Sequence, residues 1–169
     1  MHQAAAIITY LSPGLRFFHE GQFEGRKARV SPHLVRKPDE PLNRELSSFY
    51  ERLRSVLRHP LTRQGTWRLL ECAPAWDGNW TWDCFIAWSW EGGDGSRVLI
   101  AVNYAANQAQ CFVRWPFLEL GGRTARLTDL IGSAQYDRGG AELLSRGLYL
   151  DLPPWGGHVF SVTLASSGS

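Results

Sequence analysis

The sequence predicts a mainly β protein in which an antiparallel β-sandwich of Greek-key type follows a helix-strand-loop-helix segment. Two observations predict this fold class. Apolar residues recur at helical spacing only within the first 60 residues. After Leu61, seven short β-rich runs are separated by turn residues, which is typical of a sandwich. The change of pattern separates residues 1–60 from an all-β unit at 61–165, and a tail at 166–169 is expected to be disordered.

The composition indicates an ordinary globular protein. Hydrophobic residues make up 44% of the 169 residues, charged residues make up 20%, and the formal charge is +2. The basic residues are too scattered for a nucleic-acid footprint. No apolar run approaches the roughly 20 residues of a membrane span. We therefore expect no nucleic-acid partner and no membrane partner.

The three cysteines predict buried thiols in a cytoplasmic protein. Cys72, Cys84 and Cys111 lie far apart in apolar, strand-like runs and lack the paired spacing of a zinc site. Such cysteines usually behave as small apolar residues. We expect no metal and no other cofactor.

The first residues predict a helix followed by a buried strand. Ala4–Leu11 suits the end of a helix, and Ser12-Pro13-Gly14 then stops it. Leu15–His19 follows as a short strand that is apolar enough to be covered on both faces.

A long loop and a second helix complete this segment. Arg26–Leu42 holds three prolines and is expected to be irregular. Asn43 is a good N-cap, and apolar residues then recur along one stripe until Pro60 closes the pattern. We therefore expect a helix at 44–58.

Seven runs predict the strands of the sandwich: Thr66–Cys72, Trp82–Trp90, Val98–Tyr104, Gln110–Trp115, Thr124–Leu127, Leu148–Leu152 and Val159–Leu164. Gly92–Gly95 predicts a hairpin loop, so the second and third runs should be antiparallel neighbours. Arg97–Asn103 is apolar almost throughout, which favours a central strand. Leu148–Leu152 alternates in the manner of a half-buried strand.

The order of these elements resembles the end of the enzymes of glycoside hydrolase family 13, the α-amylase family. There the last helix-strand-helix of a (β/α)8 barrel precedes an all-β domain C. Many members carry a Gly-x-Pro-x-x-x-x-Gly-x-Glu motif on the eighth strand, and Gly14 and Gly21 fall in register with it. Arg16 stands at its Pro position and Phe23 at its Glu position, while Glu24 follows one residue late.

Three runs of the β unit resemble domain C of the same family. Arg97–Tyr104 is similar to its recurrent apolar strand ending in Asn, Leu152–Gly157 to its penultimate turn, and His158–Val162 to its closing strand. The resemblance implies that residues 1–60 are the end of a catalytic barrel and that residues 61–165 are the all-β domain beside it.

The resemblance also implies a function. Retaining members of the family use two carboxylates about 5–5.5 Å apart, which lie on earlier barrel strands and would precede Met1. We therefore expect a carboxyl-terminal fragment of an α-amylase-type glycoside hydrolase acting on α-glucans. The fragment itself should be inactive and should support the missing barrel. Because its barrel neighbours are absent, the apolar amino-terminal segment should associate with another copy.

The resemblance places candidate substrate-binding residues at the rim of the parent's site. Barrel sites are built from loops at the carboxyl ends of the strands, and His19, Glu20 and Gln22 follow the predicted eighth strand. The alternative is that these residues pack the barrel rim and cap the loop.

Trp76 and Trp80 are candidate carbohydrate-stacking residues. They stand with Asp and Asn in a polar-aromatic stretch, and indole rings suit the apolar C–H faces of sugars. A second hypothesis is therefore an independent carbohydrate-binding β-sandwich. The alternative is that tryptophans fill the sandwich core, as expected for the remaining strand residues of this type: Trp67, Trp82, Trp88, Trp90 and Trp115.

A small standalone enzyme is the hypothesis with the least support. No nucleophile, base and orienting group can be assembled from the motifs, so we expect no catalytic residue in the chain. Asp129, Tyr136 and Asp137 fall in segments predicted to be irregular, and no partner follows from their spacing. We expect the two carboxylates to be solvated surface charges.

Overall fold

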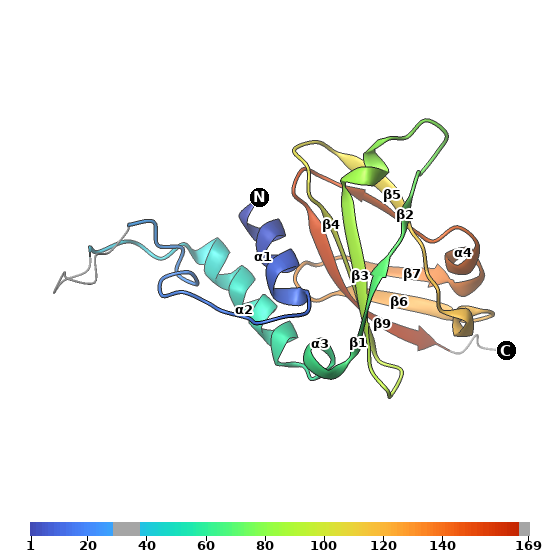
Figure 1. Cartoon of the computed structure of the whole chain (residues 1–169), viewed down its shortest axis with the longest axis horizontal. Helices are drawn as coiled ribbons and strands as arrows, with labels where there is room; N and C mark the ends of the chain where they lie inside the picture. The colour runs from blue at the N-terminus through green and yellow to red at the C-terminus, as the bar shows by residue number, and fades with distance from the viewer. Residues whose placement is uncertain (29–37, 166–169) are drawn as a thin grey trace.

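The computed structural model describes residues 1–28 and 38–165, in which two antiparallel sheets pack together and helices cover one outer face (Figure 1). The larger sheet has the order β1-β3-β4-β9-β6-β7 and the smaller sheet the order β2-β5-β8. A β-rich antiparallel fold preceded by helices is thus confirmed. The described residues close no barrel.

The elements have the following bounds. The six-stranded sheet contains β1 (Thr66–Leu70), β3 (Phe85–Glu91), β4 (Arg97–Asn103), β6 (Thr124–Asp129), β7 (Gln135–Gly139) and β9 (Gly157–Ala165). The three-stranded sheet contains β2 (Cys72–Ala73), β5 (Ala109–Val113) and β8 (Leu148–Leu152). The helices are α1 (His2–Leu11), α2 (Arg44–Arg58), α3 (Leu61–Gln64) and α4 (Gly140–Ser145), with 3-10 turns η1 (Thr81–Cys84) and η2 (Leu118–Leu120).

One hydrophobic core lies between the two sheets. The larger sheet contributes buried side chains that include Ala87, Leu99, Ala101, Leu127 and Phe160, and the smaller sheet contributes Ala109, Cys111, Val113, Leu148 and Leu150. Alternate residues of each strand point to this side because side chains alternate along a strand. Burial of these apolar faces drives the two sheets together.

A second core lies between the outer face of the six-stranded sheet and the helices. Strand β4 is apolar on both faces, since Leu99 faces the other sheet while Ile100 and Val102 pack under α1 and α2. The near-continuous apolar run in the sequence therefore matches a central strand that is covered on both faces. Leu53 of α2 is fully buried in this cluster.

Two indoles attach α1 to the sheet. The Nε1–H groups of Trp88 and Trp90 both donate to the carbonyl oxygen of Leu11, at 3.0 and 2.7 Å. Leu11 ends α1, where carbonyl groups have no partner within the helix. The strand thus supplies the hydrogen bonds that the helix terminus lacks.

Helix α2 has the bounds that the sequence predicts. The Asn43 side chain accepts a hydrogen bond from the Leu46 N–H at 3.0 Å, which caps the first turn. The buried stripe consists of Phe49, Tyr50, Leu53, Val56 and Leu57. This amphipathic stripe is the signal that made the helix predictable.

The predicted strand at Leu15–His19 is wrong. These residues belong to neither sheet, and the side chains of Leu15 and Phe17 are 94% and 75% exposed. A strand needs neighbours to bond its backbone groups, and the described residues provide none here. Part of the predicted loop, 29–37, and the predicted disordered tail, 166–169, lie outside the described residues.

Further elements differ from the sequence-based expectation. The predicted run Trp82–Trp90 begins as a strand only at Phe85, because Trp82–Cys84 lie in η1. The predicted run Thr66–Cys72 divides at Glu71, so that β1 joins one sheet and β2 the other. Strand β7 was not predicted because its sequence, QYDRG, lacks apolar alternation. Helix α4 has six residues, too few to show a helical period.

Candidate functional site

The loop between β2 and η1 presents the two candidate carbohydrate-stacking residues to solvent. Trp76 and Trp80 are 55% and 68% exposed, as predicted. Between them, the buried Asn79 shapes the loop: its Nδ2 donates to Thr81 Oγ1 at 2.9 Å, and its Oδ1 accepts from the Ala75 N–H at 3.4 Å. The two indoles are therefore held on a structured turn.

The outer face of the three-stranded sheet adjoins this loop. Thr81 Oγ1 accepts a hydrogen bond from the Gln110 N–H at 3.0 Å, which ties η1 to β5. On β5 and β8, Gln110 stands opposite Asp151 and Phe112 opposite Tyr149. Gln110 Nε2 donates to Asp151 Oδ1 at 2.9 Å. Amide, carboxylate and aromatic groups thus lie side by side on the outer face of this sheet.

The remaining strand tryptophans follow the expectation of a sandwich core only in part. Trp115 is buried in that core and Trp82 packs half-buried against it, whereas Trp88 and Trp90 are buried in the second core, between the six-stranded sheet and the helices. Trp67 is 37% exposed, so its expected burial is wrong. It lies on β1, an edge strand whose burial pattern leaves four of five residues exposed.

Gln22, one of the three candidate rim residues, is buried at the helix pair. Its Nε2 donates to the hydroxyl oxygens of Tyr10 and Tyr50 at 2.6 and 2.7 Å, and its Oε1 accepts from the His19 N–H at 3.2 Å. Burial raises the pKa of Tyr50, against the effect of the Gln22 hydrogen bond. The carboxamide therefore fastens the 19–25 turn onto α1 and α2, as the capping alternative expects.

His19 and Glu20 lie at the surface beside this buried group. The His19 Nδ1 is 3.0 Å from the Glu20 carbonyl oxygen. His19 and Gln22 line a cavity of about 600 Å³ together with His2, Arg26 and Trp155. The structure thus brings His19 and Gln22 to one cavity.

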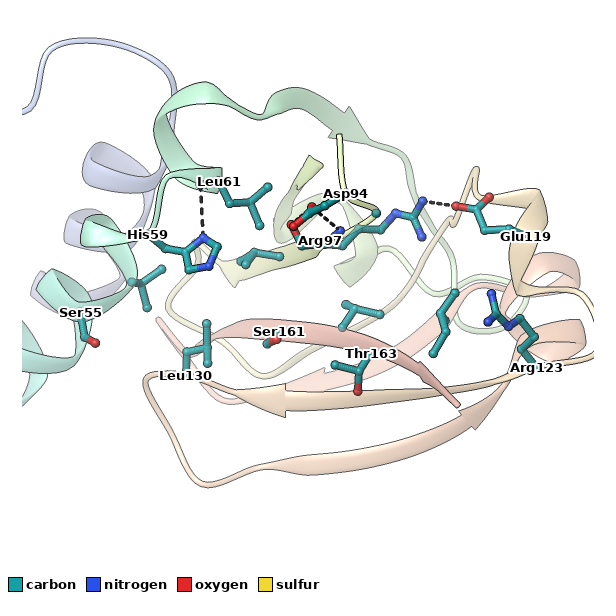
Figure 2. Close-up of a pocket in the computed structure, with 16 residues that line it drawn as sticks. Ser55, His59, Leu61, Asp94, Arg97, Glu119, Arg123, Leu130, Ser161 and Thr163 are labelled. Carbon is teal, nitrogen blue, oxygen red and sulfur yellow. Dashed lines mark hydrogen bonds and ion pairs between the residues drawn. The ribbon is translucent and has the colours of Figure 1, made fainter. Parts of the chain in front are cut away.

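A pocket that sequence reasoning missed lies over the outer face of β4 and β9. Figure 2 shows Ser55 and His59 on one side, Arg97 with Glu119 and Arg123 on the other, and Ser161 and Thr163 of β9 beneath. Its volume is about 700 Å³. These residues come from segments far apart in the chain, so no local motif marks them.

Two polar residues of this pocket, Arg97 and His59, already form contacts with other parts of the protein. Arg97 forms ion pairs with Glu119 and Glu91, and its guanidinium lies 4.3 Å from the centre of the Phe117 ring. The His59 Nδ1 accepts from the Leu61 N–H at 3.2 Å, at the first residue of α3. The arrangement offers contacts to a ligand, and these described groups form no nucleophile and base pair.

Asp129 is buried, which corrects the expectation of a solvated charge. Its Oδ2 lies 2.7 Å from His158 Nδ1, and its Oδ1 accepts from the N–H groups of Ile131 and Val159. Burial opposes ionisation, but the His158 hydrogen bond and the two backbone donors outweigh it and lower the pKa of Asp129. The carboxylate holds the β6–β7 turn against β9.

Asp137 and the cysteines match their expectations more closely. Asp137 is exposed and forms a two-bond ion pair with Arg126 at 2.8 and 2.9 Å.

The three thiols are free, with Cys111 buried and the other two half-buried. A hydrogen bond between thiols raises the pKa of Cys111 and lowers that of Cys72.

No protein-family model matches the sequence, and no curated protein matches it. Within 1–28 and 38–165, no helix is long and apolar enough to cross a bilayer. In the same ranges, no three His, Cys, Asp or Glu side chains are grouped closely enough to hold a metal ion.

Proposed function

We propose that the chain is the non-catalytic closing part of an α-amylase-type glycoside hydrolase. Residues 1–60 would complete a catalytic barrel, and residues 61–165 would form a Greek-key domain C that supports it. The protein as a whole would act on α-glucans. The missing barrel is the partner that this function requires.

The contacts of Asn103 carry this proposal. Its Nδ2 donates to the carbonyl oxygens of Leu152 and Pro153 at 3.2 and 3.0 Å, and its N–H donates to that of Gly156 at 2.9 Å. Asn103 ends one run that resembles domain C, and residues 152–157 form another. Two motifs 49 residues apart are thus joined by hydrogen bonds. This supports the interpretation that both belong to one domain C.

The amino-terminal segment supports the same proposal. Gly14 and Gly21, which match the eighth-strand motif, have φ values of +133° and +82°, a region that favours glycine. Between them, Leu15 and Phe17 expose apolar side chains on a segment without regular secondary structure that follows a helix. Barrel strands bond to a neighbour on each side, so adjacent strands would cover this segment.

The decisive experiment joins the chain to the polypeptide encoded directly upstream of Met1. The longer protein should hydrolyse a chromogenic α-glucan, and the 169-residue chain alone should not. A longer protein with Leu15→Asp and Phe17→Asp should lose activity because the segment could no longer pack into the barrel. Hydrolysis by the isolated chain, or an inactive longer protein, would contradict the proposal.

Self-association of the isolated chain is a consequence of the same exposed segment. Copies should associate through Leu15 and Phe17, because exposed apolar surface favours association. Sedimentation velocity should give a concentration-dependent mass that Leu15→Asp with Phe17→Asp reduces to 19.1 kDa. A wild-type chain that stays monomeric at all concentrations would contradict this.

A second candidate function, glucan binding, is favoured by the exposed indoles of Trp76 and Trp80. Millimolar maltooligosaccharide should change the tryptophan fluorescence of the chain, because stacking alters the surroundings of the rings. Trp76→Ala with Trp80→Ala should abolish the change. A wild-type chain that does not respond would leave this function without support.

A further inference from the structure

A further concave site lies on the outer side of the three-stranded sheet, next to the tryptophan loop. It has a volume of about 450 Å³, within the usual range for small-ligand sites of about 300–1,000 Å³. Its lining consists of Phe112, Tyr149, Asp137, Arg138, Glu142 and Arg146, with Ala75 on the loop side. The site is formed where β5, β7, β8 and α4 meet.

Two aromatic rings form one wall of this site. Phe112 and Tyr149 are cross-strand partners with ring centroids 5.5 Å apart. Arg146 lies 4.8 Å from the centre of the Phe112 ring, whereas Tyr149 is 42% exposed. The tyrosine ring is therefore accessible to an apolar C–H face such as that of a sugar.

The charged groups of the site compensate one another. Two arginines, Arg138 and Arg146, stand against two carboxylates, Asp137 and Glu142, so the formal charge of the lining is zero. Asp137 also forms an ion pair with Arg126, which lies outside the lining. A charged ligand would meet both attraction and repulsion here, whereas hydroxyl groups could use both the donors and the acceptors. This favours a neutral polyhydroxyl ligand.

The site is continuous with the tryptophan loop. Ala75 lines the cavity and directly precedes Trp76. From this continuity and the lining chemistry we propose that the cavity around Tyr149 is a glucosyl-binding subsite that extends the surface of Trp76 and Trp80. The proposal rests on the glucan-binding function and adds a binding position to it.

Calorimetric titration with maltoheptaose tests the subsite. Tyr149→Ala should weaken binding by about threefold to tenfold, the range expected for loss of one aromatic contact. Arg146→Ala should also weaken it. Tyr104→Ala is the matched control, since Tyr104 is 44% exposed but packs on Trp155 away from this cavity. Its affinity should equal that of the wild type.

The possible results separate the subsite from the function on which it rests. A wild-type chain that binds no maltoheptaose would overturn both. If Trp76→Ala abolishes binding while Tyr149→Ala and Arg146→Ala leave it unchanged, the subsite alone is overturned.

Discussion

The two sheets of the sandwich differ most in their outer faces. On the six-stranded sheet, β4 is buried at nearly every position, and helices lie over it. On the three-stranded sheet, β8 alternates strictly, and its outward residues, Tyr149 and Asp151, are exposed. A strand that is apolar on both faces requires a covering element. A strand with one polar and aromatic face can leave that face free for a ligand.

Substitution of one large residue on each outer face gives the widest expected contrast. Leu53→Ala under the helix cover should cost about 3 kcal/mol in the free energy of unfolding, because it leaves a cavity at a fully buried site. Tyr149→Ala on the open face should cost less than about 1 kcal/mol. Urea unfolding followed by circular dichroism measures both values. Equal losses would mean that the two faces do not differ in the way described.

The shared carbonyl of Leu11 allows a test of how the cover is attached. Trp88→Phe or Trp90→Phe alone leaves this buried acceptor with one indole donor. The double variant leaves it with neither, at a cost of about 1–3 kcal/mol. The double variant should therefore lose more stability than the sum of the single losses. Additive losses in thermal unfolding would show that the two donors act independently.

The N-cap of α2 should contribute less. Asn43→Ala removes the side-chain acceptor for the Leu46 N–H and should cost about 1 kcal/mol. Ser48→Ala is a matched control within the same helix, where Ser48 is exposed and alanine is the better helix former. A larger loss for Ser48→Ala than for Asn43→Ala in urea unfolding would contradict the capping role.

The smallest expected effect is the loss of stability at low pH where Asp129 links β6 to β9. Because the pKa of Asp129 is lower in the folded protein than in the unfolded chain, its contribution is present above about pH 4 and is lost as the pH falls further. Asp129→Asn should flatten this part of the stability profile between pH 5 and about pH 2. Asp137→Asn should change it less, because the exposed ion pair with Arg126 is screened by solvent. A steeper profile in Asp129→Asn would refute the assignment.

Elements that carry their own periodic signal could be predicted from the sequence. Helix α2 has a cap and an apolar stripe, and the Arg97–Asn103 run is the central strand β4. Strand β7 could not be predicted, since its pairing with β6 rests on polar contacts such as that of Arg126 with Asp137. Leu15–His19 has strand-like residues, but a strand also needs neighbours.

Residues of the candidate site could also be predicted only where a local sequence pattern marks them. The exposure of Trp76 and Trp80 followed from their polar loop. The partnership of Phe112 with Tyr149 depends on β5 pairing with β8, which lie 35 or more positions apart in the chain. Asp129 meets His158 across 29 residues for the same reason. Pairing between distant strands therefore decides which of these side chains become neighbours, and local sequence patterns do not show that pairing.

The attachment of α1 has a consequence for the order of folding. The Leu11 carbonyl oxygen accepts hydrogen bonds from indoles that lie 77 and 79 residues later in the chain. During synthesis α1 leaves the ribosome before its partners in β3, which follow only after several more seconds of translation. A ten-residue helix is marginal in water by itself. The newly made α1 should therefore remain open to chaperones until the sheet beneath it is complete.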